Sequence, residues 1–70
     1  MTGAEFLKRL KRLGKKLGKA VWFDQVLGHG SHGMVHFGDK CTVIKDRKKE
    51  IGPSLLASML RDLGVSKGDF

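Results

Sequence analysis

The chain has very little of several residue types that define whole classes of protein. Its single cysteine, Cys41, excludes an internal disulfide and favours a cytoplasmic protein over a secreted one. No apolar run approaches the ~18 residues that a membrane-spanning helix needs. The basic N-terminus is not followed by a continuous apolar region, which argues against a secretory signal. We therefore expect a protein with no membrane-embedded segment.

Acidic residues are also scarce, and the positive charge is concentrated at one end. Fourteen Lys/Arg against seven Asp/Glu give a net charge of +7. Residues 1–19 hold seven of the basic residues against Glu5 alone, which leaves +6 there and +1 in the remainder. A concentrated basic surface attracts nucleic-acid phosphates or anionic lipid. A solvated helix face that only keeps the protein soluble is the alternative.

Seventy residues suffice for one small domain, so we expect a single domain over residues 1–70. Its first element is a helix that starts at a capping box, Thr2 with Glu5 three residues on, and ends near Gly18. The helix is amphipathic, because an apolar stripe faces a basic side. The stripe consists of Phe6, Leu10, Leu13 and Leu17, with Leu7 on its flank. Such a helix is also able to lie on a membrane surface, but the strands that follow need a helix to cover them.

Three strand-like runs, at residues 20–26, 34–37 and 40–45, come next. Gly38-Asp39 is a hairpin signal between the last two. Three consecutive strands with short connections predict an antiparallel meander.

The last part of the chain predicts a charged loop and a second helix. The loop covers residues 46–50, and the helix starts at Pro53 and ends at Gly64. We expect residues 65–70 to form a loose tail. The apolar stripe of this helix consists of Leu55, Leu56, Met59, Leu60 and Leu63. The predicted fold is α+β, in the order α-β-β-β-α, with a three-stranded antiparallel sheet, two helices on one face and the other face open.

The glycine-rich segment at residues 28–33, with two of the three histidines, is the most distinctive stretch of the chain. If Val35 and Phe37 belong to the core, His36 looks out from the open sheet face, and so does His32 if the strand begins early enough. Three interpretations of the histidines stay open. They have no chemical role, they perform acid/base chemistry near neutral pH, or they bind zinc. The zinc set would be His29, His32, His36 and Cys41, whose spacing matches no established pattern.

Nearly the whole chain resembles the HicA-type toxin family of messenger-RNA interferases. The resemblance is carried first by Gly30-Ser31-His32-Gly33 and by the short strand ending in Phe37. Glu5-Phe6-Leu7-Lys8-Arg9-Leu10 is similar to the family's opening helix. The last part is similar over Lys45-Asp46, over Lys48-Lys49-Glu50-Ile51-Gly52-Pro53, and over the leucine stripe that ends at Leu63-Gly64.

The resemblance implies a fold like a double-stranded RNA-binding domain and a ribonuclease activity that inhibits translation. It also implies a HicB-type antitoxin that neutralises the toxin by binding it. The family's catalytic histidine corresponds to His32. This chain departs from many members by having Gly33, and not a second histidine, directly after it.

RNA cleavage is plausible here without a metal cofactor, because RNA carries its own nucleophile, the 2′-hydroxyl. A neutral imidazole at His32 would take the hydroxyl proton. The charge that develops on the phosphate needs hydrogen-bond donors. The turn at Gly30, Ser31 and Gly33 and the side chain of Lys45 are the candidates. The first helix is expected to hold RNA phosphates through Lys8, Lys11, Arg12 and Lys15.

Three further residues receive simpler interpretations. Core packing is the first expectation for Trp22 and Phe23, and stacking on an RNA base is the alternative for one of them. Cys41 is expected to be a small buried or half-buried residue.

Two other classes of function compete with the ribonuclease. The first is a non-catalytic RNA-binding module of the same fold, which needs the basic surface but no histidine on a glycine turn. The second is a basic interaction domain that binds only an acidic protein partner, which predicts no RNA affinity at moderate salt.

Overall fold

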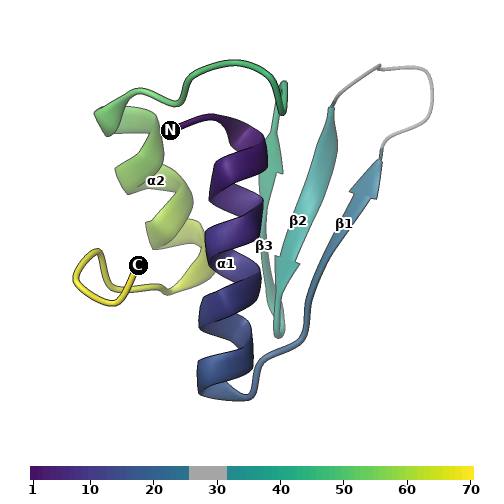
Figure 1. Cartoon of the computed structure of the whole chain (residues 1–70), viewed down its shortest axis with the longest axis vertical. Helices are drawn as coiled ribbons and strands as arrows, with labels where there is room; N and C mark the ends of the chain where they lie inside the picture. Colours follow the sequence, from purple (N-terminus) through teal and green to yellow (C-terminus); the bar gives the residue numbers. More distant parts are fainter. Residues whose placement is uncertain (26–31) are drawn as a thin grey trace.

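Two helices flank a three-stranded antiparallel sheet in the computed structural model, which describes residues 1–25 and 32–70. The elements are α1 (Gly3–Leu17), β1 (Val21–Gln25), β2 (Gly33–Phe37), β3 (Lys40–Ile44) and α2 (Pro53–Leu63) (Figure 1). The predicted α-β-β-β-α order is confirmed. No helix within the described ranges is long and apolar enough to cross a membrane.

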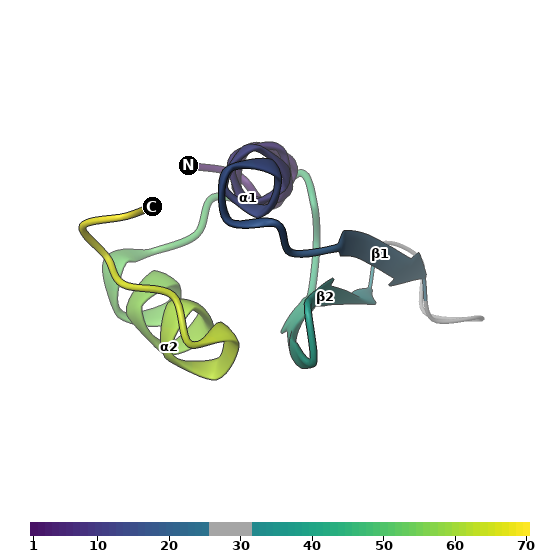
Figure 2. The ribbon, with the colours of Figure 1, turned by 90° about the horizontal axis from the view of Figure 1, so that it is seen from below.

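The sheet has one covered and one open face. Its strands lie in the order β1-β2-β3, and a turn at Gly38, with φ of 63°, joins the last two. Val35, Phe37 and Ile44 are buried on the face that both helices cover (Figure 2). The intervening side chains of each strand point to the other face, which neither α1 nor α2 covers (Figure 2).

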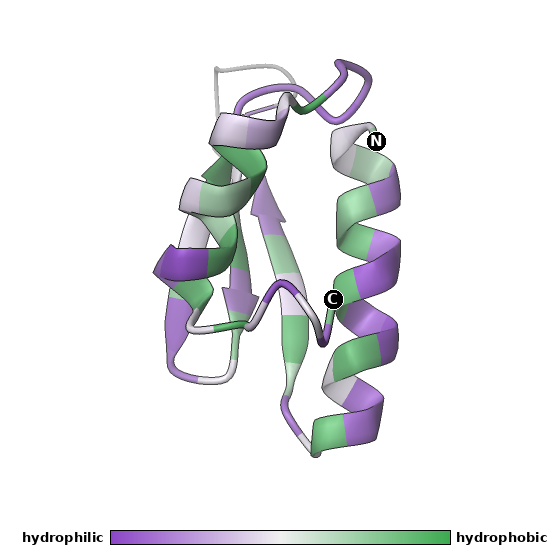
Figure 3. Ribbon diagram, turned by 90° about the vertical axis from the view of Figure 1, so that its left-hand side faces the viewer, coloured by the Kyte–Doolittle hydropathy of each residue, from purple (hydrophilic) through white to green (hydrophobic). Residues whose placement is uncertain are grey.

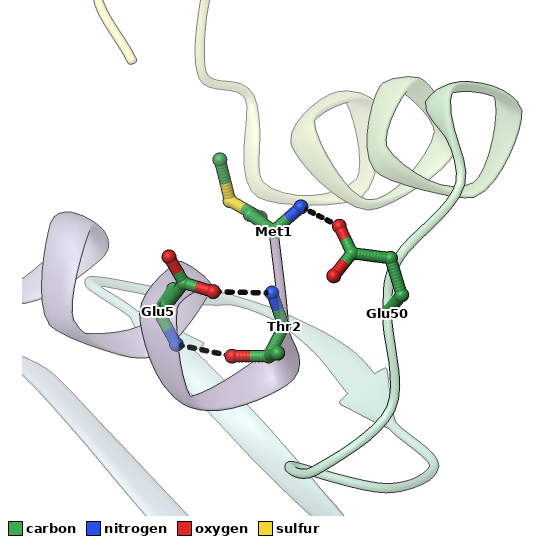
Figure 4. A network of polar contacts seen from close by, with 4 residues as sticks. All are labelled: Met1, Thr2, Glu5 and Glu50. Carbon is green, nitrogen blue, oxygen red and sulfur yellow. Dashed lines mark hydrogen bonds and ion pairs between the residues drawn. The ribbon is translucent and has the colours of Figure 1, made fainter.

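The first helix begins as the sequence predicts. The Thr2 hydroxyl accepts a hydrogen bond from the Glu5 backbone N–H, and the Glu5 carboxylate accepts one from the Thr2 backbone N–H (Figure 4). This second bond stabilises the charged carboxylate and therefore lowers the pKa of Glu5. The helix ends at its cap, Gly18.

Two members of the predicted apolar stripes lie outside the core. Phe6, Leu10 and the other stripe positions near them are buried, but Leu17 is 51% exposed and Leu55 is 49% exposed. Helical periodicity places both residues on the correct side of their helix. Leu17 lies in the last turn of α1 and Leu55 in the first turn of α2. Because periodicity does not show where along a helix the core ends, it predicts a longer buried stripe than each helix has.

The charged loop at residues 46–50 is tied to the start of α1. The first backbone N–H groups of a helix have no partner within it. Here the N–H of Gly3 donates to the Lys49 carbonyl at 3.2 Å, and that of Ala4 donates to the Arg47 carbonyl at 2.9 Å. The N-terminal ammonium pairs with the Glu50 carboxylate (Figure 4). These contacts fix the position of Lys49.

The prediction of a loose tail at residues 65–70 is wrong. The Phe70 ring lies 5.1 Å from the Phe6 ring, between centroids, and the Arg9 guanidinium lies 5.6 Å from the Phe70 centroid. Val65 packs against the core as well. Phe70 therefore anchors residues 65–70 to α1.

Candidate functional site

His32 lies immediately before β2, and its side chain is exposed. The pairing of β2 and β3 ends with Gly33 opposite Ile44, and the residues that directly flank this last pair are His32 and Lys45. The predicted acid/base residue and the predicted lysine are therefore neighbours at one end of the sheet.

A groove of about 620 Å³ opens beside these two residues, between β3, the loop that follows it and α2. His32, Lys45 and Lys49 all line the groove. Its apolar part includes the exposed Leu55 and the buried Met59. The groove thus combines one imidazole and two ammonium groups with an apolar wall, which suits a ligand that is both anionic and partly apolar.

Three carboxylates also line the groove, and each has a partner. Asp46 accepts a hydrogen bond from a backbone N–H two residues on, at 2.9 Å. Asp62 accepts one from the buried Thr42 hydroxyl at 3.0 Å, and Glu50 pairs with the N-terminal ammonium. The two lysines of the groove form no ion pair within the described ranges. Their charges are therefore available to an anionic ligand.

The basic residues of α1 lie elsewhere. All four predicted phosphate-binding side chains of this helix are exposed, and none lines the groove. Figure 3 shows the hydrophilic side of α1 turned away from the sheet. The structure therefore does not bring these four residues together with His32. They are Lys8, Lys11, Arg12 and Lys15.

The glycine turn is only partly described. Gly30 and Ser31 lie outside the described residues, as does His29. Gly33 is buried as the first residue of β2. A Cβ atom there would lie 2.3 Å from the Phe23 ring and 2.6 Å from the Asp24 carbonyl oxygen. Close packing therefore explains a glycine at this position, whether or not its N–H also meets a ligand.

The open sheet face carries a cluster that the sequence did not reveal. Trp22 is 42% exposed on this face, so the expectation that it packs in the core is wrong. Its ring stacks on that of His36, and His36 also pairs with Asp24. Phe23 follows the expectation and packs against the core. Cys41, expected to be at least half-buried, is exposed because it also points to the open face.

No group of three or more His, Cys, Asp or Glu side chains suited to a metal ion occurs among residues 1–25 and 32–70. The zinc set considered from the sequence includes His29, which lies outside these ranges. The remaining members do not form such a group by themselves.

Comparisons with known proteins return no family model, no curated protein and no solved structure that matches this chain. The fold therefore rests on the geometry described above. The resemblance to HicA-type toxins rests on the residues quoted from the sequence and stays a prediction.

Proposed function

We propose that this protein is a metal-independent endoribonuclease of the HicA toxin type, which cleaves messenger RNA in the cytoplasm and so inhibits translation. The observation that carries the proposal is that His32 and Lys45, which directly flank the paired ends of β2 and β3, line one groove together with Lys49. An imidazole beside unpaired ammonium groups is what base-assisted cleavage of a phosphodiester needs. The net charge of +7 supports a polyanionic substrate.

The proposed reaction uses the RNA itself as nucleophile. The neutral imidazole of His32 takes the proton of a 2′-hydroxyl, and the oxygen attacks the adjacent phosphorus. The new O2′–P bond forms as the P–O5′ bond breaks, and the departing oxygen takes up a proton. The products are a 2′,3′-cyclic phosphate and a 5′-hydroxyl end. The Lys45 ammonium stabilises the negative charge that grows on the phosphate oxygens.

His36 does not act on the same phosphate as His32. His36 lies in β2 and His32 immediately before it, and the four positions from one to the other correspond to about 13 Å along an extended strand. An acid and a base that serve one phosphate must both reach its oxygens. A second histidine therefore does not replace the one that many HicA-type members carry directly after the first.

A HicB-type antitoxin is the proposed partner, and it would inhibit the toxin by covering the groove that contains His32. The apolar wall with the exposed Leu55 offers a protein partner an area to bury. A complex that cleaves RNA as fast as the free protein would contradict this arrangement.

A non-catalytic RNA-binding module is the second candidate, and one observation favours it. The basic side of α1 is separate from the groove, so the main electrostatic surface does not depend on His32. This candidate predicts salt-sensitive RNA affinity without cleavage.

Cleavage of a long single-stranded RNA in EDTA separates the two candidates. Loss of the general base should lower the rate of His32→Ala by about 10²–10⁴-fold. Loss of a donor to the phosphate should lower that of Lys45→Ala by about 10²–10³-fold. Lys67→Ala, an exposed lysine outside the groove, is the matched control and should cleave like wild type. Circular dichroism checks that all variants fold.

Three results would count against the proposed ribonuclease mechanism. End analysis that finds 5′-phosphates would rule out the proposed route. Equal rates for wild type and His32→Ala would remove His32 from the mechanism. Tight RNA binding by every variant without any cleavage would favour the binding module.

A further inference from the structure

The aromatic cluster on the open sheet face is a built arrangement of two rings. Trp22 and His36 are direct cross-strand partners of β1 and β2. Their ring centroids lie 4.6 Å apart, and the ring planes differ by only 7°. In this stack, each ring covers one face of the other. Because Trp22 is 42% exposed, much of the indole still faces solvent.

A carboxylate holds the imidazole in place. His36 Nε2 lies 3.0 Å from the Asp24 Oδ2. Asp24 stands two residues after Trp22 on the same face of β1, so both contacts to His36 come from one strand. The imidazole is thus fixed by the indole at its face and by the carboxylate at its edge. A ligand that stacks on a fixed ring system loses less ordering entropy than one that must first arrange it.

The rings lie on the same face as the proposed reaction centre. Met34 and His36 share one face of β2, and Met34 also lines the groove beside His32. The four positions from 32 to 36 correspond to about 13 Å along an extended strand. Among residues 1–25 and 32–70, no helix covers this face of the sheet (Figure 2). A polyanion in the groove at His32 therefore contacts Met34, which lies next to the two rings on the same sheet face.

We propose that Trp22 and His36, with Asp24 holding the imidazole, form a stacking platform for an unpaired base of RNA near the cleaved phosphate. The inference rests on the proposed function for the identity of the ligand. It goes further by naming the substrate class. Bases inside a duplex are stacked on one another and cannot reach the platform, whereas unpaired bases stack readily on aromatic side chains. The platform therefore selects single-stranded RNA, although the fold resembles one associated with duplexes.

The chain itself offers the probe. It has one tryptophan and no tyrosine, so its intrinsic emission at tryptophan wavelengths comes from Trp22. The ligand is an unstructured 2′-O-methyl RNA oligonucleotide, which lacks the nucleophile and is not cleaved. Binding should quench the Trp22 emission. The same sequence annealed into a duplex should change the emission much less.

Substitutions of Trp22 and His36 measure how much the two rings contribute to RNA affinity. A base stacked on an aromatic side chain contributes about 1–3 kcal/mol, so Trp22→Ala should weaken binding of the labelled oligonucleotide by about 5- to 100-fold in fluorescence anisotropy. His36→Ala should weaken it too. Trp22→Phe should restore much of it, because phenylalanine also stacks. Leu17→Ala, which removes an exposed side chain at the end of α1, is the matched control and should bind like wild type.

Two results would overturn the platform. One is an unchanged Trp22 emission on saturation with the oligonucleotide, which is also the outcome if this face binds only a protein. The other is equal affinity of wild type, Trp22→Ala and His36→Ala, with circular dichroism showing that both variants are folded. His32→Ala separates the two proposals. Binding of the oligonucleotide should still quench the Trp22 emission of His32→Ala. If the wild type shows this quenching but does not cleave RNA, the ribonuclease proposal is refuted and the platform is retained.

Discussion

Phe70 provides the sharpest test of the fold, because its docking was not expected from the sequence. The ring packs against Phe6 at 5.1 Å and under the Arg9 guanidinium at 5.6 Å. Phe70→Ala removes both contacts and leaves the two helices and the sheet unchanged. If the tail is docked in solution, this one substitution far from the sheet should destabilise the whole domain.

The expected loss can be worked from three contributions. Burying a whole phenylalanine side chain is worth about 1.5–3 kcal/mol, so a half-buried ring contributes about 1 kcal/mol. The aromatic pair adds about 0.5–1.5 kcal/mol. The exposed cation–π contact adds about 0.5 kcal/mol. The sum is about 2–3 kcal/mol, against a total stability of about 4–10 kcal/mol for a domain of this length.

Thermal unfolding followed by far-ultraviolet circular dichroism measures this loss. At about 4–8 °C for each kcal/mol, the Tm of Phe70→Ala should fall by about 8–24 °C. Lys67→Ala, an exposed side chain of the same segment, should leave the Tm unchanged. The Arg9→Ala and Phe70→Ala double mutant should show a coupling of about 0.5 kcal/mol. A decrease no larger than that of the Lys67 control would refute the docked tail. RNA cleavage well below the Tm should be unaffected, because Phe70 does not line the groove.

Three further predictions concern the local structure. Thr2→Ala removes the cap and should cost about 1 kcal/mol in urea unfolding, whereas an unchanged midpoint would contradict the capping box. Because the pKa of Glu5 is lowered, its stabilising contribution is present above the ordinary value of 4.5 and is lost as pH falls through the lowered pKa. Glu5→Gln should flatten stability across that acid range. Gly33→Ala drives a methyl group into Phe23 and should lower the Tm strongly, whereas Gly68→Ala, with no contact under 3.8 Å, should not.

The local elements of the fold were predictable because their signals lie within a few residues. The capping box, the helix ends, the hairpin at Gly38 and the order of the strands all follow from short-range rules. Features that depend on distant partners were not predictable in this way. The Phe70 anchor and the hydrogen bonds from residues 46–50 to α1 join segments that are far apart in the chain.

In the candidate site, too, single residues could be predicted from the sequence, but contacts between strands could not. His32 and Lys45 were selected from the sequence, and the strand register then makes them neighbours. The stack of Trp22 on His36 was missed because alternation tells which residues share a face of one strand but not which residue lies opposite on the next. Cys41 was misplaced for a related reason. β3 has apolar residues on both faces, so its pattern does not distinguish them.

The separation of the basic helix from the groove changes the role that its charge can play. A cation that touches the cleaved phosphate must lie within contact distance of His32, and the groove supplies Lys45 and Lys49 for this purpose. The hydrophilic side of α1 is turned away from the sheet (Figure 3), so its basic residues would act on the same RNA segment only through their electric field. Such a field raises the rate of encounter with a polyanion and is screened over about 10 Å at moderate salt. Under the proposed function, the helix would therefore collect RNA, while the groove and the open sheet face would decide which RNA is held and where it is cut.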